Sequence, residues 1–148
     1  MTFYLLDTNV ISELAPGRPT RDVGVVNWLE ANSGALFLSV VTVAEIQAGI
    51  VLAISGGATG RAGRLAEWLA AVLHLYGSRV LACDVATARV AGTIFGKARS
   101  EGLSPGWPDI MIAATAAHHG LTVLTRNLRH FRALGVAVAD PFVAGREG

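Results

Sequence analysis

Short apolar runs rich in branched residues alternate along this chain with stretches whose apolar residues recur at helical spacing. A parallel sheet covered by helices on both faces produces this alternation, because its strands are buried on both sides. We therefore expect an α/β fold with about five strands, at residues 3–6, 36–39, 80–83, 122–124 and 136–139. Helices are expected at residues 10–14, 22–31, 41–52, 64–76, 85–100 and 109–119, with breaks at 56–60 and 104–108.

Length and composition limit the class of protein. A chain of 148 residues suits one domain, which we place at residues 1–142, followed by a short C-terminal tail at 143–148. With 52% hydrophobic and 16% charged residues it should bury a large core or form an interface, and Trp28 and Trp68 fit either use. No apolar run reaches the roughly 18 residues of a membrane span, and the N-terminus lacks an export pattern. We therefore expect a cytoplasmic protein whose single cysteine, Cys83, is a buried free thiol.

Basic residues are few but unusual in kind. The net charge of +1 gives no global basic field that would indicate nucleic acid. Eleven of the twelve basic residues are arginines, however, and arginine binds phosphate and carboxylate in a bidentate way. Arg126, Arg129 and Arg132 lie close together, with His130 among them. They form either the solvated face of a short helix or part of a site.

Three carboxylates stand alone in apolar surroundings. Asp7 precedes every other charged residue, Glu45 is the only one within 31–60, and Asp109 is the only one within 102–125 when histidines are left aside. Each follows a predicted strand or opens a predicted helix, where open α/β folds keep their sites. A buried acid is costly unless another charge meets it, so three acids that meet one another predict a divalent metal site.

Helix capping explains each acid separately. Residues 7–9 can cap the helix that follows, Thr42 and Glu45 have the spacing of a capping box, and Asp109 follows Pro108 in a first helical turn. Three isolated capping acids are a less economical account than one metal site. Both uses nevertheless stay open for each residue at this point.

Other polar residues have structural interpretations. Asp84 precedes a predicted helix and is expected to cap it, and Asp140 is expected to form a terminal turn with Pro141. His118 and His119 end a predicted helix, where partial positive charge is favourable. Their spacing does not indicate a zinc site.

With the three acids in place, the chain resembles the PIN-domain ribonucleases, in particular the VapC-type toxins of bacterial toxin–antitoxin pairs. The matching segments are LLDTNVISEL at 5–14, VTVAEIQAGI at 41–50 and PDIMIAATAAHHGLTVLTRNLRHF at 108–131. The resemblance implies a three-layer α/β/α sandwich whose parallel sheet gathers acids at one edge to hold Mg²⁺ or Mn²⁺. It implies that Asp7 and Asp109 bind the metal directly, and that Glu45 binds it directly or through water.

The fourth acidic position of the family falls on Asn127, where the commonest residue is Asp. An amide oxygen can bind a metal or a water on it but contributes no charge, so whether one or two metals bind stays open. The resemblance also implies that the substrate is contacted by residues on either side of the acids: Thr8, Asn9, Thr125, Arg126 and Arg129.

The function that the resemblance implies is metal-dependent hydrolysis of RNA phosphodiester bonds by a toxin. The expected partners are the RNA substrate, a VapB-type antitoxin and a second copy of the chain. An aspartate-nucleophile phosphatase is one alternative, but its motif needs a second acid where this chain has Asn9 and a later lysine, whereas Lys97 stands alone. The other alternative is a PIN-like scaffold that binds RNA or protein without cutting. Asn127, in place of the fourth acid, would then be a sign of lost catalytic activity. The RNA and the antitoxin are not named by the sequence.

Overall fold

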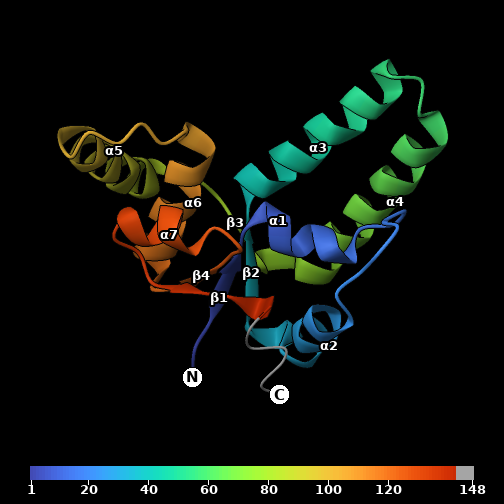
Figure 1. Cartoon of the computed structure of the whole chain (residues 1–148), viewed down its shortest axis with the longest axis horizontal. Helices are drawn as coiled ribbons and strands as arrows, with labels where there is room; N and C mark the ends of the chain where they lie inside the picture. Colours follow the sequence, from blue (N-terminus) through green and yellow to red (C-terminus); the bar gives the residue numbers. More distant parts are fainter. Residues whose placement is uncertain (143–148) are drawn as a thin grey trace.

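A five-stranded parallel sheet forms the centre of the computed structural model, which describes residues 1–142 (Figure 1). Its strands are β1 (Tyr4–Leu6), β2 (Leu36–Ser39), β3 (Val80–Leu81), β4 (Thr122–Leu124) and β5 (Val138–Ala139), in the order β3-β2-β1-β4-β5. Every neighbouring pair is parallel, and Leu5 of the central strand pairs with Phe37 of β2 and Val123 of β4. The predicted parallel α/β fold is confirmed.

Helices cover both faces of the sheet (Figure 1). One face carries α1 (Thr8–Ile11), α2 (Val23–Ala31), α3 (Val40–Ser55) and α4 (Thr59–Tyr76), and the other carries α5 (Val85–Ser100), α6 (Trp107–His119) and α7 (Leu128–Ala133). Because side chains alternate along a strand, Leu6 joins the first of two apolar clusters and Leu5 the second. The result is the expected three-layer sandwich.

The strand order reverses next to β1. From β1 the chain moves outward to β2 and then β3, whereas β4 returns to the other side of β1 and leads outward to β5. In open parallel sheets, the crevice at such a reversal, beyond the carboxyl ends of the strands, is where ligands bind. This geometry places the residues after β1 and β4, Asp7 and Thr125, at the preferred position for a site.

The α3–α4 hairpin is longer than the sequence predicts. Helix α3 extends to Ser55 and α4 begins at Thr59, so the reversal needs only residues 56–58, with Gly57 at φ +82°. A left-handed φ is costly for residues other than glycine, which explains why the turn falls there. The early start of α4 also buries Ala62 against the core, and this packing is a tertiary gain that the local sequence does not reveal.

Strand β3 is shorter than predicted because β2, its neighbour in the sheet, ends first. Leu81 pairs with Ser39, and Ser39 is already the N-cap of α3, so β3 has no partner beyond that pair. Cys83 therefore lies after the strand and is a half-buried free thiol, not the buried one that was expected. Strand β5 likewise covers only the second half of the predicted 136–139.

Several local predictions are confirmed. Asp84 caps α5 by accepting the Thr87 N–H, and the N–H and hydroxyl of Thr87 lower the pKa of that carboxyl. Asp140 forms the expected turn, in which Oδ1 accepts the Phe142 N–H at 2.8 Å. Trp28 and Trp68 are both half-buried at the margin of the apolar cluster that contains Leu6. The predicted tail at 143–148 lies outside the described residues.

Within residues 1–142, the helices include none with both the length and the apolar character that crossing a membrane requires.

Candidate active site at the carboxyl edge of the sheet

Asp7 is both a helix cap and a buried acid. Its Oδ1 accepts the Thr8 N–H at 2.8 Å, which caps α1, and its Oδ2 accepts the Thr125 hydroxyl at 2.8 Å. The Asp7 N–H is held in turn by the Leu124 carbonyl at 2.9 Å, so the pairing of β1 with β4 extends to the acid itself. The cap and the site are thus two uses of one side chain, with a carboxylate only 6% exposed.

The carboxyl of Asp7 is a weaker acid than usual. Burial is the largest cause and raises its pKa, the hydrogen bonds from Thr125 and Thr8 lower it, and the nearby carboxylates of Asp109 and Glu45 raise it again. Desolvation and like charge both disfavour the ionised form. The fold therefore brings the three predicted acids into one electrostatic neighbourhood in which a cation would relieve the repulsion.

Glu45 is held by α1 and does not form the predicted capping box. The N-cap of α3 is Ser39, whose Oγ accepts the Val41 N–H at 3.0 Å, so Glu45 lies in the second turn of the helix. Its Oε1 accepts the Thr8 hydroxyl at 2.7 Å. The Thr8 hydroxyl also lies 3.1 Å from the hydroxyl of buried Thr42, so the Thr8 side chain is held between α1 and α3.

Asp109 opens α6 and has a partner that the sequence analysis missed. It lies in the first turn after Gly106, with Pro108 beside it, as the capping interpretation expected. Its Oδ2 is 2.9 Å from His130 Nε2, and both side chains are partly exposed. The only signal in the sequence was that His130 stands among arginines late in the chain, and nothing local connects it with Asp109.

Thr125 and Asn127 form the loop between β4 and α7. Thr125 is fully buried, and besides donating to Asp7 its hydroxyl oxygen accepts the Asn127 N–H at 2.9 Å. Asn127 precedes α7, and its exposed side chain makes no capping hydrogen bond to that helix. It lines a groove together with Asp109, which leaves its amide oxygen available to a ligand.

The donors fit a hard cation held largely through water. No three His, Cys, Asp or Glu side chains among residues 1–142 converge closely enough to enclose one ion. Mg²⁺ nevertheless binds typically through one or two carboxylates and keeps several waters, and it takes oxygen ligands. Asp7, Asp109 and Glu45 supply carboxylate oxygens, and the pKa of Asp7 is raised first by burial and then by the like charges of the other two acids. The residues present are thus chemically able to take Mg²⁺ or Mn²⁺, and the metal itself stays a prediction.

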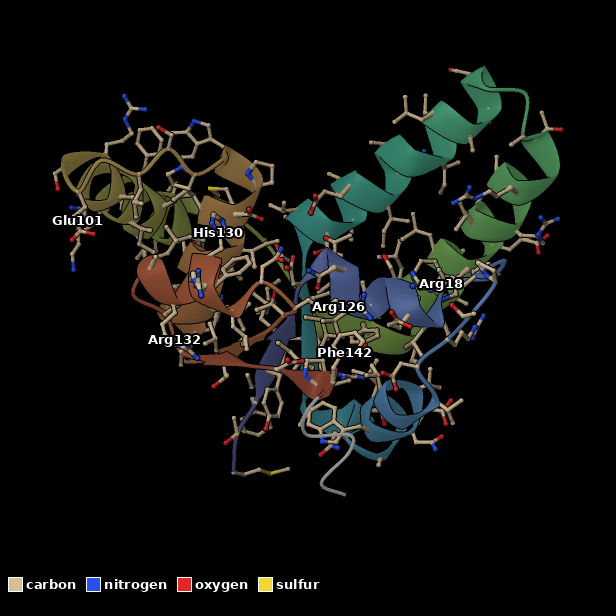
Figure 2. All side chains as sticks on the ribbon, in the orientation of Figure 1. Arg18, Glu101, Arg126, His130, Arg132 and Phe142 are labelled. Carbon is tan, nitrogen blue, oxygen red and sulfur yellow. The ribbon has the colours of Figure 1, made fainter. Side chains whose placement is uncertain are left out.

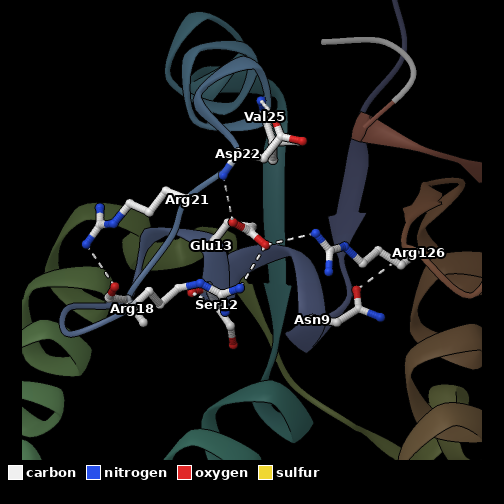
Figure 3. Close-up of polar contacts among 9 residues, drawn as sticks. Asn9, Ser12, Glu13, Arg18, Arg21, Asp22, Val25 and Arg126 are labelled. Atoms are coloured by element: carbon white, nitrogen blue, oxygen red, sulfur yellow. Dashed lines mark hydrogen bonds and ion pairs between the residues drawn. The ribbon is translucent and has the colours of Figure 1, made fainter. Parts of the chain in front are cut away.

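A second charged cluster lies beside α1, centred on Glu13 (Figure 3). Glu13 is 1% exposed, and its Oε1 lies 3.1 Å from nitrogens of both Arg18 and Arg126. The Arg126 guanidinium also lies 3.6 Å above the Phe142 ring, and Figure 2 shows these two side chains side by side. Arg126, expected to contact substrate, is thus engaged within the protein.

Sequence reasoning missed the role of Glu13. The one available signal was an acid inside the short apolar segment 10–14, with no basic residue before Arg18. Asn9 borders the same cluster, since the Arg126 N–H points at its Oδ1 from 3.5 Å. Arg129 and Asn127 instead face the groove beside Asp109.

Comparison with known proteins agrees with this geometry. The family model of the PIN domain matches residues 4–136. Toxin FitB of Neisseria gonorrhoeae is 38% identical over 139 residues, covering 93% of this chain and 97% of FitB. A plasmid stability protein, StbB, of Pseudomonas syringae is 39% identical, with 95% and 99% covered, and a VapC ribonuclease of Sinorhizobium fredii is 35% identical, with 93% and 96% covered.

Solved structures are similar over the same length. The crystal structure of FitAcB from Neisseria gonorrhoeae superimposes with a TM-score of 0.83 at 38% identity, covering 95% of this chain and 99% of the other. DNA-bound VapBC from Salmonella typhimurium gives a TM-score of 0.71 at 25% identity, with 95% and 99% covered. The resemblance to PIN-domain ribonucleases of the VapC type is confirmed, and the chain belongs to the PIN-domain family.

Proposed function

We propose that this protein is a metal-dependent endoribonuclease and the toxin of a toxin–antitoxin pair. The observation that carries the proposal is that Thr8 joins buried Asp7 to Glu45 where the strand order reverses, with Asp109 near enough to raise the Asp7 pKa. Relatives named as a toxin and as a VapC ribonuclease, each covering more than nine tenths of the chain, support the same class of activity.

The residues of the site have separable tasks. A bound Mg²⁺ or Mn²⁺ supplies positive charge to the phosphoryl group and acidifies a water molecule. Asp7 and Asp109 are the groups that would hold it, the first fixed by Thr125 and the second by His130. Glu45, oriented by the Thr8 hydroxyl, is placed to position or deprotonate the attacking water. Asn127 contributes an amide oxygen on the open side.

The direct test is cleavage of a broad RNA pool by the purified protein with Mg²⁺ or Mn²⁺, and with a chelator as control. We expect cutting that the chelator abolishes and that Asp7→Asn and Asp109→Asn each reduce to background. Arg132→Ala is a suitable control, because that exposed side chain makes no ion pair within residues 1–142. Metal-dependent cutting that survives both acid substitutions would refute this site.

The two alternative functions give different results. In place of the second acid of a phosphatase motif the chain has Asn9, whose Oδ1 faces the Arg126 N–H, and Lys97 lies in the last turn of α5. A phosphoryl group trapped on Asp7 would nevertheless establish that chemistry. RNA or protein binding with no cutting in either metal would indicate the non-catalytic scaffold.

We also propose that the chain forms a homodimer and binds a small antitoxin that occludes the acidic edge. Similar solved structures are those of FitAcB and of DNA-bound VapBC, which supports a two-component assembly. Light scattering of the purified chain should give the mass of a dimer. Co-expression with a VapB-type antitoxin should yield a complex in which cutting is suppressed. A chain that stays monomeric and cuts equally well in that mixture would contradict both expectations.

A further inference from the structure

An open groove of about 820 Å³ begins at Asp109 and runs between the 103–105 segment and α7. Its volume falls within the range of roughly 300–1,000 Å³ typical of small-ligand sites. Leu103, Pro105 and Leu134 give it apolar walls, whereas Asn127, Arg129 and His130 bring polar groups to it. The groove is therefore continuous with the acidic edge and has both an apolar and a cationic side.

Of the basic side chains around this groove, Arg129 is the one whose charge is not paired with an acid within residues 1–142. Arg126 is ion-paired with Glu13, and His130 is bonded to Asp109. Arg129 is exposed and forms no ion pair with any residue in 1–142. An uncommitted guanidinium beside an apolar wall suits a ligand with an anionic and a flat apolar part.

We propose that this groove binds the nucleotide next to the scissile phosphate, with its phosphate on Arg129 and its base against Leu103, Pro105 and Leu134. The inference rests on the proposed ribonuclease function. An RNA strand is continuous, so a phosphate held at Asp109 must have a neighbouring nucleotide on adjacent surface, and the groove is such a surface. The same assignment makes Arg126 a positioning residue that ties the β4–α7 loop to Glu13 and does not contact RNA.

The chain offers matched variants on one helix. Arg129 and Arg132 are both exposed arginines of α7, but Arg132 does not line the groove, and Figure 2 shows it on the side of α7 away from His130. Ala133 is exposed and lines the groove, so Ala133→Phe fills it. Ala88→Phe, at an exposed position of α5 that does not line the groove, is the size-matched control.

The experiment measures binding of a short, fluorescently labelled single-stranded RNA pool by anisotropy in EDTA, over a series of salt concentrations. Without metal there is no cutting, so binding is read separately from activity. We expect Arg129→Ala to weaken binding and to lower the slope of log affinity against log salt by about 0.7, the value for one phosphate contact on a single strand. Arg132→Ala should leave that slope unchanged.

Filling the groove tests the base contact. Ala133→Phe should weaken binding on the order of tenfold, which corresponds to about 1.4 kcal/mol, because the phenyl ring takes the space of the base. Ala88→Phe should bind like the parent protein, and thermal melts verify that all variants fold. Because Ala133 and Ala88 are both exposed, a general packing defect would affect both variants.

The outcomes separate this inference from the proposed function. If the parent protein cuts RNA in Mg²⁺ but Arg129→Ala and Ala133→Phe bind like it, the groove assignment is overturned while the ribonuclease remains. Groove-dependent binding without cutting in either metal would show that the groove binds RNA, but it would overturn the ribonuclease and with it the assignment to a nucleotide next to a scissile phosphate. Weakened binding of a purified antitoxin by these variants, with RNA binding unchanged, would show that the groove takes protein instead and would also overturn the inference.

Discussion

The hydroxyl of Thr125 donates a 2.8 Å hydrogen bond to Oδ2 of Asp7, across 118 residues of sequence. The bond exists because β4 lies beside β1 in the sheet and both residues directly follow their strands. It is the largest influence that keeps the Asp7 pKa from rising further. Thr125 therefore orients the central acid and helps to keep it ionised.

Replacing that hydroxyl should impair both catalysis and folding stability. Thr125→Val keeps the shape but removes the donor to Asp7 and the acceptor for the Asn127 N–H. We expect a loss of about 10- to 100-fold in kcat, as for other residues that orient a metal ligand. The free energy of unfolding should fall by about 1.5–3 kcal/mol, since the bond is to a charged group. Thr125→Ser should retain most of both, and a valine variant with parental kcat would contradict this role.

Asp7→Asn should stabilise the metal-free protein while abolishing its activity. Burial raises the folded-state pKa of Asp7 above its ordinary value of 3.8, so the folded state holds this proton more tightly than the unfolded state. The parent protein then loses stability as pH rises from 3.8 through the folded pKa, and remains less stable above it. Urea unfolding across this range should show a stability difference that grows with pH and then levels off. A constant difference would mean that Asp7 is not responsible.

Metal should stabilise the parent protein selectively. A ligand that binds only the folded state adds about 2.7 kcal/mol at 100 times its dissociation constant. Mg²⁺ or Mn²⁺ should therefore raise the melting temperature of the parent protein, and Asp7→Asn, which removes the buried charge, should lose most of that rise. Ca²⁺ and monovalent salt at equal ionic strength are the controls. Equal shifts in both proteins would indicate that the cation binds elsewhere.

The Glu13 cluster should respond to substitution in a strongly non-additive way. The side chains of Arg18 and Arg126 are 35% and 47% exposed, so removing either one leaves Glu13 paired with the other and should cost about 1 kcal/mol or less. Removing both leaves a buried carboxylate without a cationic partner, which costs about 3–5 kcal/mol. A double-mutant cycle by urea unfolding measures the difference, and additive single effects would show that the arginines do not share Glu13.

The sequence determined much of this protein by itself. Alternating short runs and helical patterns gave the parallel sheet, because strands buried on both faces must be apolar throughout. The cap at Asp84 and the turn at Asp140 were also predictable, since each depends on residues within a few positions of one another. The three acids stood out because charge is scarce around them. These are local properties, and local properties can be read along the chain.

Only the tertiary structure decided which groups meet. Strand order places Thr125 on Asp7, the packing of α6 and α7 brings His130 to Asp109, and burial between Arg18 and Arg126 makes Glu13 a structural acid. The ends of strands and helices also depended on neighbours, as β3 stops where β2 becomes α3. Such contacts join residues far apart in sequence, and hydrophobic periodicity specifies which face is buried without specifying which element covers it.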